Sequence, residues 1–205
     1  ALTLNTTGTE NQAIGDQALA GLTTGAHNTG IGSQAGFYGH ALADGTKNIC
    51  VGSYSHTNAT DAVNQHVFGY NVQGSADSTF TFGDGSTEST CSFGGTTWSA
   101  PSDVRLKEDI QDEVVGLDFI NELRPVTFRW KKEKDIPEEL VSHKADSEER
   151  TMNGKYNHGF IAQEVKEVID SHNLKDGFNL WSEDEADGRQ RIGEGALVPM
   201  LTKAI

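Results

Sequence analysis

The first hundred residues are punctuated by a large apolar residue followed directly by glycine. Three segments show the pattern clearly and three looser copies follow: Asn11-Gln12-Ala13-Ile14-Gly15, Asn28-Thr29-Gly30-Ile31-Gly32, Asn48-Ile49-Cys50-Val51-Gly52, and the pairs Phe68-Gly69, Phe82-Gly83 and Phe93-Gly94. Successive glycines of these copies are separated by 17, 20, 17, 14 and 11 residues. A repeat of this period predicts a stacked architecture such as a solenoid, with the extra residues in loops.

Each repeat offers a strand of about four or five residues, which is too short to be stable alone. Sixteen of the 23 glycines lie in residues 1–100, and glycine raises the entropic cost of folding. We therefore expect little core within one chain, and predict that several copies turn their large apolar residues towards a shared axis. Those residues are Ile14, Ile31, Val51, Phe68, Phe82 and Phe93. Threefold symmetry is the natural closed arrangement. The alternative is a disordered Gly/Ser/Thr linker, in which regular punctuation is not expected.

Composition changes sharply near residue 100. Residues 1–101 contain seven acids and one base, Lys47, whereas residues 102–205 contain 23 acids and 15 bases. This change predicts two domains, 1–101 and 102–205. The formal net charge of −14 would repel phosphates, so nucleic acid is not expected as a partner. No apolar run approaches the ~20 residues needed to span a bilayer, so membrane insertion is not expected either.

Metal and cofactor motifs are absent from the sequence. Cys50 and Cys91 follow no metal-binding spacing, and we expect two free thiols, with a disulfide as the alternative. No His-x-His pair and no calcium-loop spacing occur. The sequence therefore predicts no metal site and no cofactor.

The second half has the patterns of a compact α+β domain. The predicted elements are a helix over 113–123, a strand over 126–130, a charged protruding arm over 131–157, a strand running into a helix over 157–165, and an apolar helix over 196–205. In the first helix, Leu117, Ile120 and Leu123 form one stripe, with Val114 a turn earlier. Arg124-Pro125 ends it, because the residue before proline is pushed out of the helical region.

Four segments of the second half occur in one order: Ser102-Asp103-Val104-Arg105-Leu106-Lys107, Gly116 to Phe128, Gly159-Phe160-Ile161-Ala162-Gln163-Glu164-Val165, and Leu197-Val198-Pro199 with Lys203-Ala204-Ile205. Together they resemble the C-terminal intramolecular chaperone domain of endosialidase-type phage tail spikes and fibres. One departure is the 191–195 region, where that family often carries a tyrosine. The repeats, best over residues 5–60, resemble the heads of trimeric adhesins and the shafts of phage fibres.

The resemblance implies a fold, an assembly and a chemistry. The fold is a mainly β fibre, a trimeric β-helix or β-roll, followed by an α+β chaperone domain. The chaperone directs folding of its own fibre as a homotrimer in the host cytoplasm and is then released, leaving the fibre in the virion. Release is autoproteolysis, with Ser102 as the nucleophile and Lys107 as its base. A lysine can act as a base where burial disfavours its ammonium form.

The scissile bond is constrained by ring size. Attack by the Ser102 hydroxyl on the carbonyl of Pro101 closes a five-membered ring and gives an N→O acyl shift, whose ester water can hydrolyse. A cut before Asp103 would more naturally need a hydroxyl from a neighbouring subunit. We therefore favour the Pro101–Ser102 bond. Asp103 is expected to cap or orient the turn, and Arg105 to form an ion pair, with a role towards an oxyanion as the alternative.

Two other functions compete with this prediction. A Ser-His-Asp hydrolase is disfavoured because no Gly-x-Ser-x-Gly elbow occurs in the sequence. The stronger alternative is a non-cleaving trimerisation cap on a receptor-binding adhesin fibre. Candidate contacts to a host receptor or glycan in the predicted loops are Tyr38, His40, Tyr54 and His56.

Overall fold

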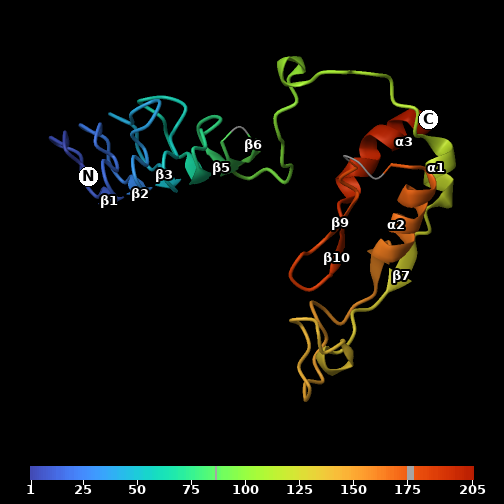
Figure 1. Cartoon of the computed structure of the whole chain (residues 1–205). Helices are drawn as coiled ribbons and strands as arrows, with labels where there is room; N and C mark the ends of the chain where they lie inside the picture. The colour runs from blue at the N-terminus through green and yellow to red at the C-terminus, as the bar shows by residue number, and fades with distance from the viewer. Residues whose placement is uncertain (86, 175–177) are drawn as a thin grey trace. The chain divides into compact units, whose positions relative to one another are not determined.

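The computed structural model describes residues 1–85, 87–174 and 178–205. The chain divides into two compact units, Ala1–Glu108 and Asp109–Ile205. The first unit contains strands β1 to β6, and the second contains helices α1 to α3 and strands β7 to β10 (Figure 1).

The first unit is a β-solenoid of about four turns. Its strands are β1 (Gln12–Ile14), β2 (Thr29–Ile31), β3 (Ile49–Val51), β4 (His66–Tyr70), β5 (Thr79–Asp84) and β6 (Thr87–Ser92). Neighbours from β1 to β5 pair in parallel, and β6 closes the sheet by pairing antiparallel with β5. The solenoid that the repeats predict is therefore confirmed.

Close stacking of the turns requires glycine after the apolar residue in the first four copies, at Gly15, Gly32, Gly52 and Gly69, whereas a Cβ at Gly94 would meet no atom within 4 Å. At Gly52 the backbone has φ +121°, and a Cβ there would lie 2.1 Å from the carbonyl oxygen of Gly69. At Gly69 (φ +129°) a Cβ would lie 1.9 Å from the carbonyl oxygen of Gly83. Only glycine fits both this backbone conformation and this separation. The repeat glycines at these positions therefore mark where the backbones of successive turns are in contact.

The residues before these glycines lie in register on adjacent strands. We call this set the apolar row: Ile14, Ile31, Val51, Phe68 and Phe82. Ile14 is 64% exposed and Phe82 is 45% exposed, so the row lies on the surface of the single chain. Phe93 follows the antiparallel strand β6 and is not in register with the row; its ring instead contacts that of His66, with the centroids 4.7 Å apart.

The expectation of little core within one chain is wrong. Two clusters of side chains are buried inside the solenoid: Leu19, Leu22, Leu42 and Ala62 in one, and Ala35, Cys50, Val67 and Val72 in the other. The error came from counting only the residue before each glycine, since most of the buried side chains lie in the corners between strands. Burial also raises the pKa of the Cys50 thiol to about 12, and Cys50 and Cys91 are both free.

A ladder of buried amides runs beside this core. It consists of Asn11, Asn28, Asn48 and Gln65, which occupy equivalent places in successive turns. The side-chain oxygen of Asn28 accepts from the backbone N–H and the side-chain amide of Asn48, both at 3.0 Å. Its own amide donates to the carbonyl oxygen of Gly45 at 2.8 Å and to Oδ1 of Asn11 at 3.1 Å. The amide ladder thus ties each turn to the next.

The second unit is the predicted α+β domain. Its elements are α1 (Leu117–Glu122), β7 (Val126–Phe128), a short 3₁₀ turn (Glu133–Asp135), β8 (Asn157–Gly159), α2 (Ala162–Ser171), β9 (Trp181–Glu183), β10 (Gln190–Ile192), a 3₁₀ turn (Glu194–Leu197) and α3 (Val198–Ala204). β7 pairs antiparallel with β8, and β9 with β10. The strand leading into the helix after residue 157 is confirmed.

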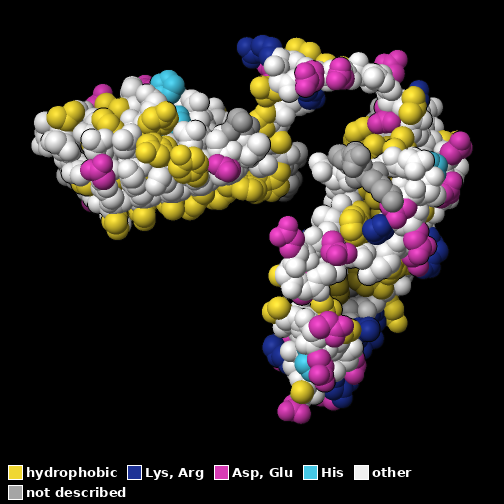
Figure 2. All heavy atoms as spheres, in the orientation of Figure 1, with side chains coloured by type: hydrophobic (Ala, Val, Ile, Leu, Met, Phe, Trp, Pro, Cys, Tyr) yellow, Lys and Arg dark blue, Asp and Glu magenta, His cyan; other side chains and the backbone are white. Residues whose placement is uncertain are grey.

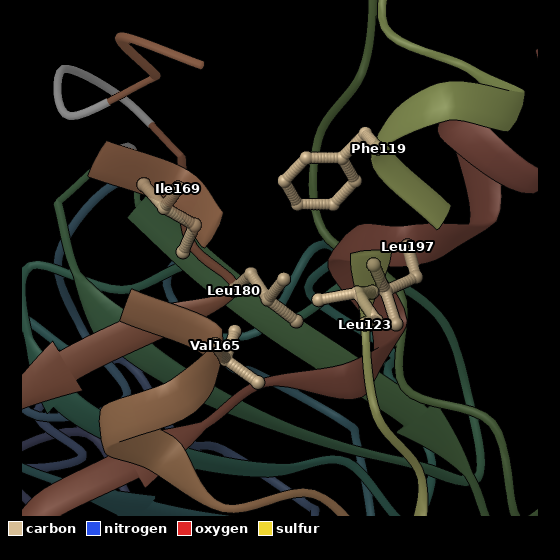
Figure 3. Packing of buried hydrophobic residues seen from close by; sticks show 6 residues of the cluster. All are labelled: Phe119, Leu123, Val165, Ile169, Leu180 and Leu197. Carbon is tan, nitrogen blue, oxygen red and sulfur yellow. The ribbon is translucent and has the colours of Figure 1, made fainter. Parts of the chain in front are cut away.

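The core of this unit joins its helices to the β9 segment. Its buried side chains are Phe119, Leu123, Val165, Ile169, Leu180 and Leu197 (Figure 3). The predicted stripe on the first helix is wrong in part, because α1 begins at Leu117 and buries Phe119, whereas Val114 and Leu117 are exposed. The helix is too short to include residues 113–116, so a stripe extrapolated through them does not form.

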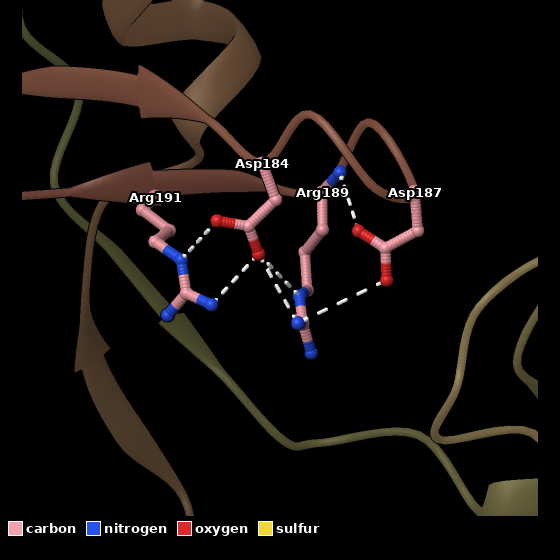
Figure 4. A network of polar contacts seen from close by, with 4 residues as sticks. All are labelled: Asp184, Asp187, Arg189 and Arg191. Atoms are coloured by element: carbon pink, nitrogen blue, oxygen red, sulfur yellow. Dashed lines mark hydrogen bonds and ion pairs between the residues drawn. The ribbon is translucent and has the colours of Figure 1, made fainter.

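Ion-pair networks lie within two charged segments, the arm between β7 and β8 and the β9–β10 hairpin. In the arm between β7 and β8, Lys132 and Lys134 both bind Glu148 and hold the pKa of its carboxyl at about 2. In the β9–β10 hairpin, Asp184 lies between Arg191 and Arg189 (Figure 4). Hydrogen bonds from Arg191 are the largest cause of a pKa of about 2 for the Asp184 carboxyl.

Candidate active site at the junction

Ser102 and Lys107 meet across a single 3₁₀ turn. The turn spans Val104–Leu106, with the backbone N–H of Leu106 donating to the carbonyl oxygen of Asp103 at 3.0 Å. The N–H of Lys107 donates to the carbonyl oxygen of Val104 at 3.1 Å. This turn folds the chain back on itself, and Lys107 Nζ donates to Ser102 Oγ at 2.7 Å. Two side chains five positions apart are thereby in hydrogen-bond contact.

Asp103 and Arg105 close the turn between them. Asp103 Oδ1 accepts from the backbone N–H of Arg105 at 2.9 Å, which is the capping role expected of Asp103. One edge of the Arg105 guanidinium binds both oxygens of the same carboxylate, with Nε donating to Oδ1 at 2.9 Å and Nη2 to Oδ2 at 2.6 Å. These hydrogen bonds lower the pKa of the Asp103 carboxyl and raise that of Arg105. Arg105 therefore forms the expected ion pair, within the turn itself.

The turn and both members of the pair are exposed in the single chain. Val104 is 68% exposed and Leu106 is 67% exposed, although both are apolar. The contact between Lys107 Nζ and Ser102 Oγ is exposed, and only a neutral amine could take the proton from that hydroxyl. The geometry therefore places nucleophile and base together, and what the single chain lacks is the burial that favours a neutral amine.

The segment before Ser102 is anchored to the end of the solenoid. Ser99 and Thr90 exchange two backbone hydrogen bonds, at 2.8 and 2.9 Å, which adds this segment to the edge of β6. Trp98 lies against Phe80 and Phe82, with ring centroids 5.9 and 5.2 Å away. The chain is thus anchored three residues before Ser102, and the candidate scissile bonds lie directly after this anchor.

Other kinds of site lack support in the described part of the chain. No group of three or more His, Cys, Asp or Glu side chains within residues 1–85, 87–174 and 178–205 could hold a metal ion. In the same ranges no helix has both the length and the apolar character needed to cross a membrane. Sequence reasoning missed Tyr70, whose ring contacts that of Tyr54; its only signal was its place directly after a repeat glycine.

A β-solenoid is followed along the chain by a serine–lysine pair and then by a small α+β domain. Comparison with family models identifies that domain: residues 102–174 match the family described as the chaperone of endosialidase. The chain therefore contains an endosialidase-type chaperone domain. The match begins at Ser102 and includes the first three of the four resembling segments, while the fourth lies beyond it. Searches of curated proteins and of solved structures found no match.

Proposed function

We propose that this chain is the C-terminal part of a phage tail fibre or spike whose chaperone domain releases itself by autoproteolysis. The chaperone domain directs the solenoid to fold and assemble as a homotrimer, and then cuts at the 101–103 junction. The observation that carries this proposal is the 2.7 Å contact between Ser102 and Lys107 at the start of the chaperone domain. The fibre enters the virion after assembly in the host cytoplasm, and the chaperone is left behind.

The apolar row supports the homotrimer. Its five side chains lie in register along the sheet and are partly or largely exposed in the single chain. Contiguous apolar surface of this kind is uncommon on monomers and marks an interface. Three copies that turn the row towards a common axis remove it from water, as a closed symmetric assembly requires.

The proposed cleavage needs no reactant besides the chain itself and one water molecule. Neutral Lys107 takes the proton of the Ser102 hydroxyl, and Oγ attacks the carbonyl carbon of Pro101. The Pro101–Ser102 amide bond breaks as the amide nitrogen takes up a proton, which leaves an ester between Pro101 and Ser102 Oγ. Water hydrolyses the ester and regenerates the hydroxyl. The chaperone then begins with the free amine of Ser102 and the fibre ends with the carboxylate of Pro101.

Exposure of the pair makes cleavage dependent on assembly. Packing of subunits around the turn covers Val104 and Leu106 and removes water from Lys107, which disfavours the ammonium form. The trimer therefore forms before the cut. Because the folding domain then leaves, the fibre becomes kinetically stable, since the template for refolding is gone.

The test is the intact mass of the folded protein. We expect two fragments, with masses that place the cut after Pro101, and a single full-length chain for Ser102→Ala and for Lys107→Ala. Lys203→Ala is the matched control and cleaves normally, because Lys203 lies in α3, far along the chain from the junction. A wild-type chain that stays full length as a folded trimer would refute autoproteolysis. Fragments that begin at Asp103 would move the cut to the next bond.

Exposure of Lys107 also favours the second candidate, a non-cleaving trimerisation cap on a receptor-binding adhesin fibre. In that case the ammonium group simply donates to Ser102 and no reaction follows. The two candidates separate in the same experiment, because a cap yields full-length trimers both for the wild type and for Lys107→Ala.

A further inference from the structure

Three tyrosines of the solenoid form a ladder across successive turns. The rings of Tyr38 and Tyr54 meet edge to face with centroids 5.1 Å apart, and those of Tyr54 and Tyr70 with centroids 5.7 Å apart. Tyr38 is 45% exposed and Tyr70 is 58% exposed, so both outer tyrosines are accessible to solvent. We call Tyr38, Tyr54 and Tyr70 the tyrosine ladder.

The unequal length of the repeats builds one end of this ladder. The longest turn, with 20 residues between Gly32 and Gly52, carries Tyr38 and His40. The His40 ring stacks on that of His56 at 6.4 Å, and the Tyr38 ring contacts His56 at 5.8 Å. His56 is buried beneath them, and its Nδ1 is 2.9 Å from the carbonyl oxygen of Tyr54. Contacts with His56 therefore help to fix the position of Tyr38 in the ladder.

Polar side chains surround a hollow beside the ladder. The hollow has a volume of about 430 Å³. It is lined by His56, Asn71, Gln73, Gly85 and Glu88 of the solenoid together with Pro101 and Leu106 of the junction. His56 both lines the hollow and contacts the ring of Tyr38, so the hollow adjoins the ladder. Aromatic rings beside a few convergent polar groups are typical of a small-molecule site.

The ladder is distinct from the surface assigned to the trimer. The apolar row precedes the repeat glycines, whereas Tyr54 and Tyr70 follow them. Figure 2 draws hydrophobic side chains, a class that includes tyrosine, in yellow. On the solenoid they form one patch along a long edge and another beside histidines. A ligand can therefore reach the ladder in an assembly that covers the row.

Charge narrows the class of ligand. Residues 1–101 contain seven acids and a single base, Lys47, and Glu88 lines the hollow itself. An anionic ligand would be repelled there and would find no arginine or lysine in the hollow lining to bind. A neutral ligand with flat C–H faces and many hydroxyls meets no such penalty, because rings contact its faces and amides bind its hydroxyls.

We propose that the tyrosine ladder and its hollow bind a neutral oligosaccharide. Stacked strands are ~4.8 Å apart, so three rings in successive turns extend over about 10 Å, the length of a short run of sugar rings. Sugar faces pack on Tyr38 and Tyr70, and hydroxyls bond to Asn71, Gln73 and Glu88. This inference rests on the proposed function, since a fibre that attaches to a host needs such a surface.

The test is saturation-transfer NMR and calorimetry on the 205-residue chain. The neutral probes are maltohexaose, cellohexaose and chitohexaose, and the anionic probe is hexagalacturonate. We expect binding of at least one neutral probe, weakened about tenfold by Tyr70→Ala and by Tyr38→Ala through loss of a stacked ring. Tyr38→Phe keeps the ring and should bind within about threefold of the wild type. Tyr156→Ala is the control, because Tyr156 is an exposed tyrosine of the other unit.

Several results would overturn the inference. These are binding of none of the neutral probes, equal or tighter binding of hexagalacturonate, binding that the tyrosine substitutions leave unchanged, and loss of trimers in Tyr70→Ala, which would make the ladder a contact between subunits. The intact mass of the same samples keeps the two proposals apart. A protein that cleaves but binds no sugar refutes only the ladder, and one that binds sugar but stays uncut refutes only autoproteolysis.

Discussion

Replacing Asn28 with alanine should destabilise the solenoid far more than one polar substitution usually does. The change removes four hydrogen bonds made by the side chain. It leaves three buried groups without a partner, namely the backbone N–H of Asn48, one proton of the Asn48 amide and the carbonyl oxygen of Gly45. At about 1–2 kcal/mol for each orphaned group, the expected loss is about 3–6 kcal/mol. Asn28 is fully buried, so water cannot readily replace these bonds.

Asn11→Ala is the matched control at the open end of the amide ladder. Asn11 is half-buried at the open end of the ladder, so its removal lets water enter the space that it leaves and reach the Asn28 N–H and amide that it bonded. The expected loss is therefore only about 1 kcal/mol. The measurement is the denaturant dependence of hydrogen exchange in peptides from residues 26–66, which reports opening of the solenoid separately from the chaperone unit. Losses that are equal for Asn28→Ala and Asn11→Ala, or below about 1 kcal/mol for both, would refute the reasoning.

Three further predictions concern the turns, the chaperone core and the hairpin. Gly52→Ala places a Cβ 2.1 Å from a carbonyl oxygen of the next turn and should cost at least about 3 kcal/mol in solenoid stability by hydrogen exchange, whereas Gly85→Ala, with no atom within 4 Å, should cost about 1 kcal/mol. Phe119→Ala empties a fully buried site and should cost about 3–5 kcal/mol in denaturant unfolding of the chaperone unit; a loss under about 1 kcal/mol would contradict the packing. Because the folded pKa of Asp184, about 2, lies below its ordinary value, its ion pairs contribute stability above about pH 4, and this contribution is lost as the pH falls towards 2. In Arg191→Ala, an NMR titration should show that pKa rising towards about 3.9, and an unchanged value would contradict the assigned cause.

Local patterns of the sequence predicted the elements of this protein well where geometry is set by neighbouring residues. The glycine spacing predicted the turns of the solenoid, because a glycine is needed wherever two turns touch. Residues 157–165 predicted a strand running into a helix, since their period changes from alternating to helical. The first helix was predicted less well. It begins at Leu117, and of the two valines before it Val115 packs against the core outside the helix while Val114 is exposed.

The sequence likewise predicted some features of the candidate site and not others. Ser102 and Lys107 were predicted from the resemblance carried by an ordered set of motifs, and Asp103 was expected to cap or orient. Their contact depends on the backbone conformation of the intervening turn, which the motif alone does not specify. The exposure of the pair depends on what else packs around it, and composition carries no information about that.

The sequence by itself determined the repeat period, the change of composition near residue 100 and the chemistry available at the junction, because each of these belongs to neighbouring residues. Only the tertiary structure decided which side chains from different turns meet. It turned Leu19 and Cys50 inwards, left the apolar row on the surface, and brought Tyr38 beside Tyr54 and Tyr70. The reason is that turns of unequal length still stack in one register, so contacts between turns depend on the closure of each loop rather than on spacing along the chain.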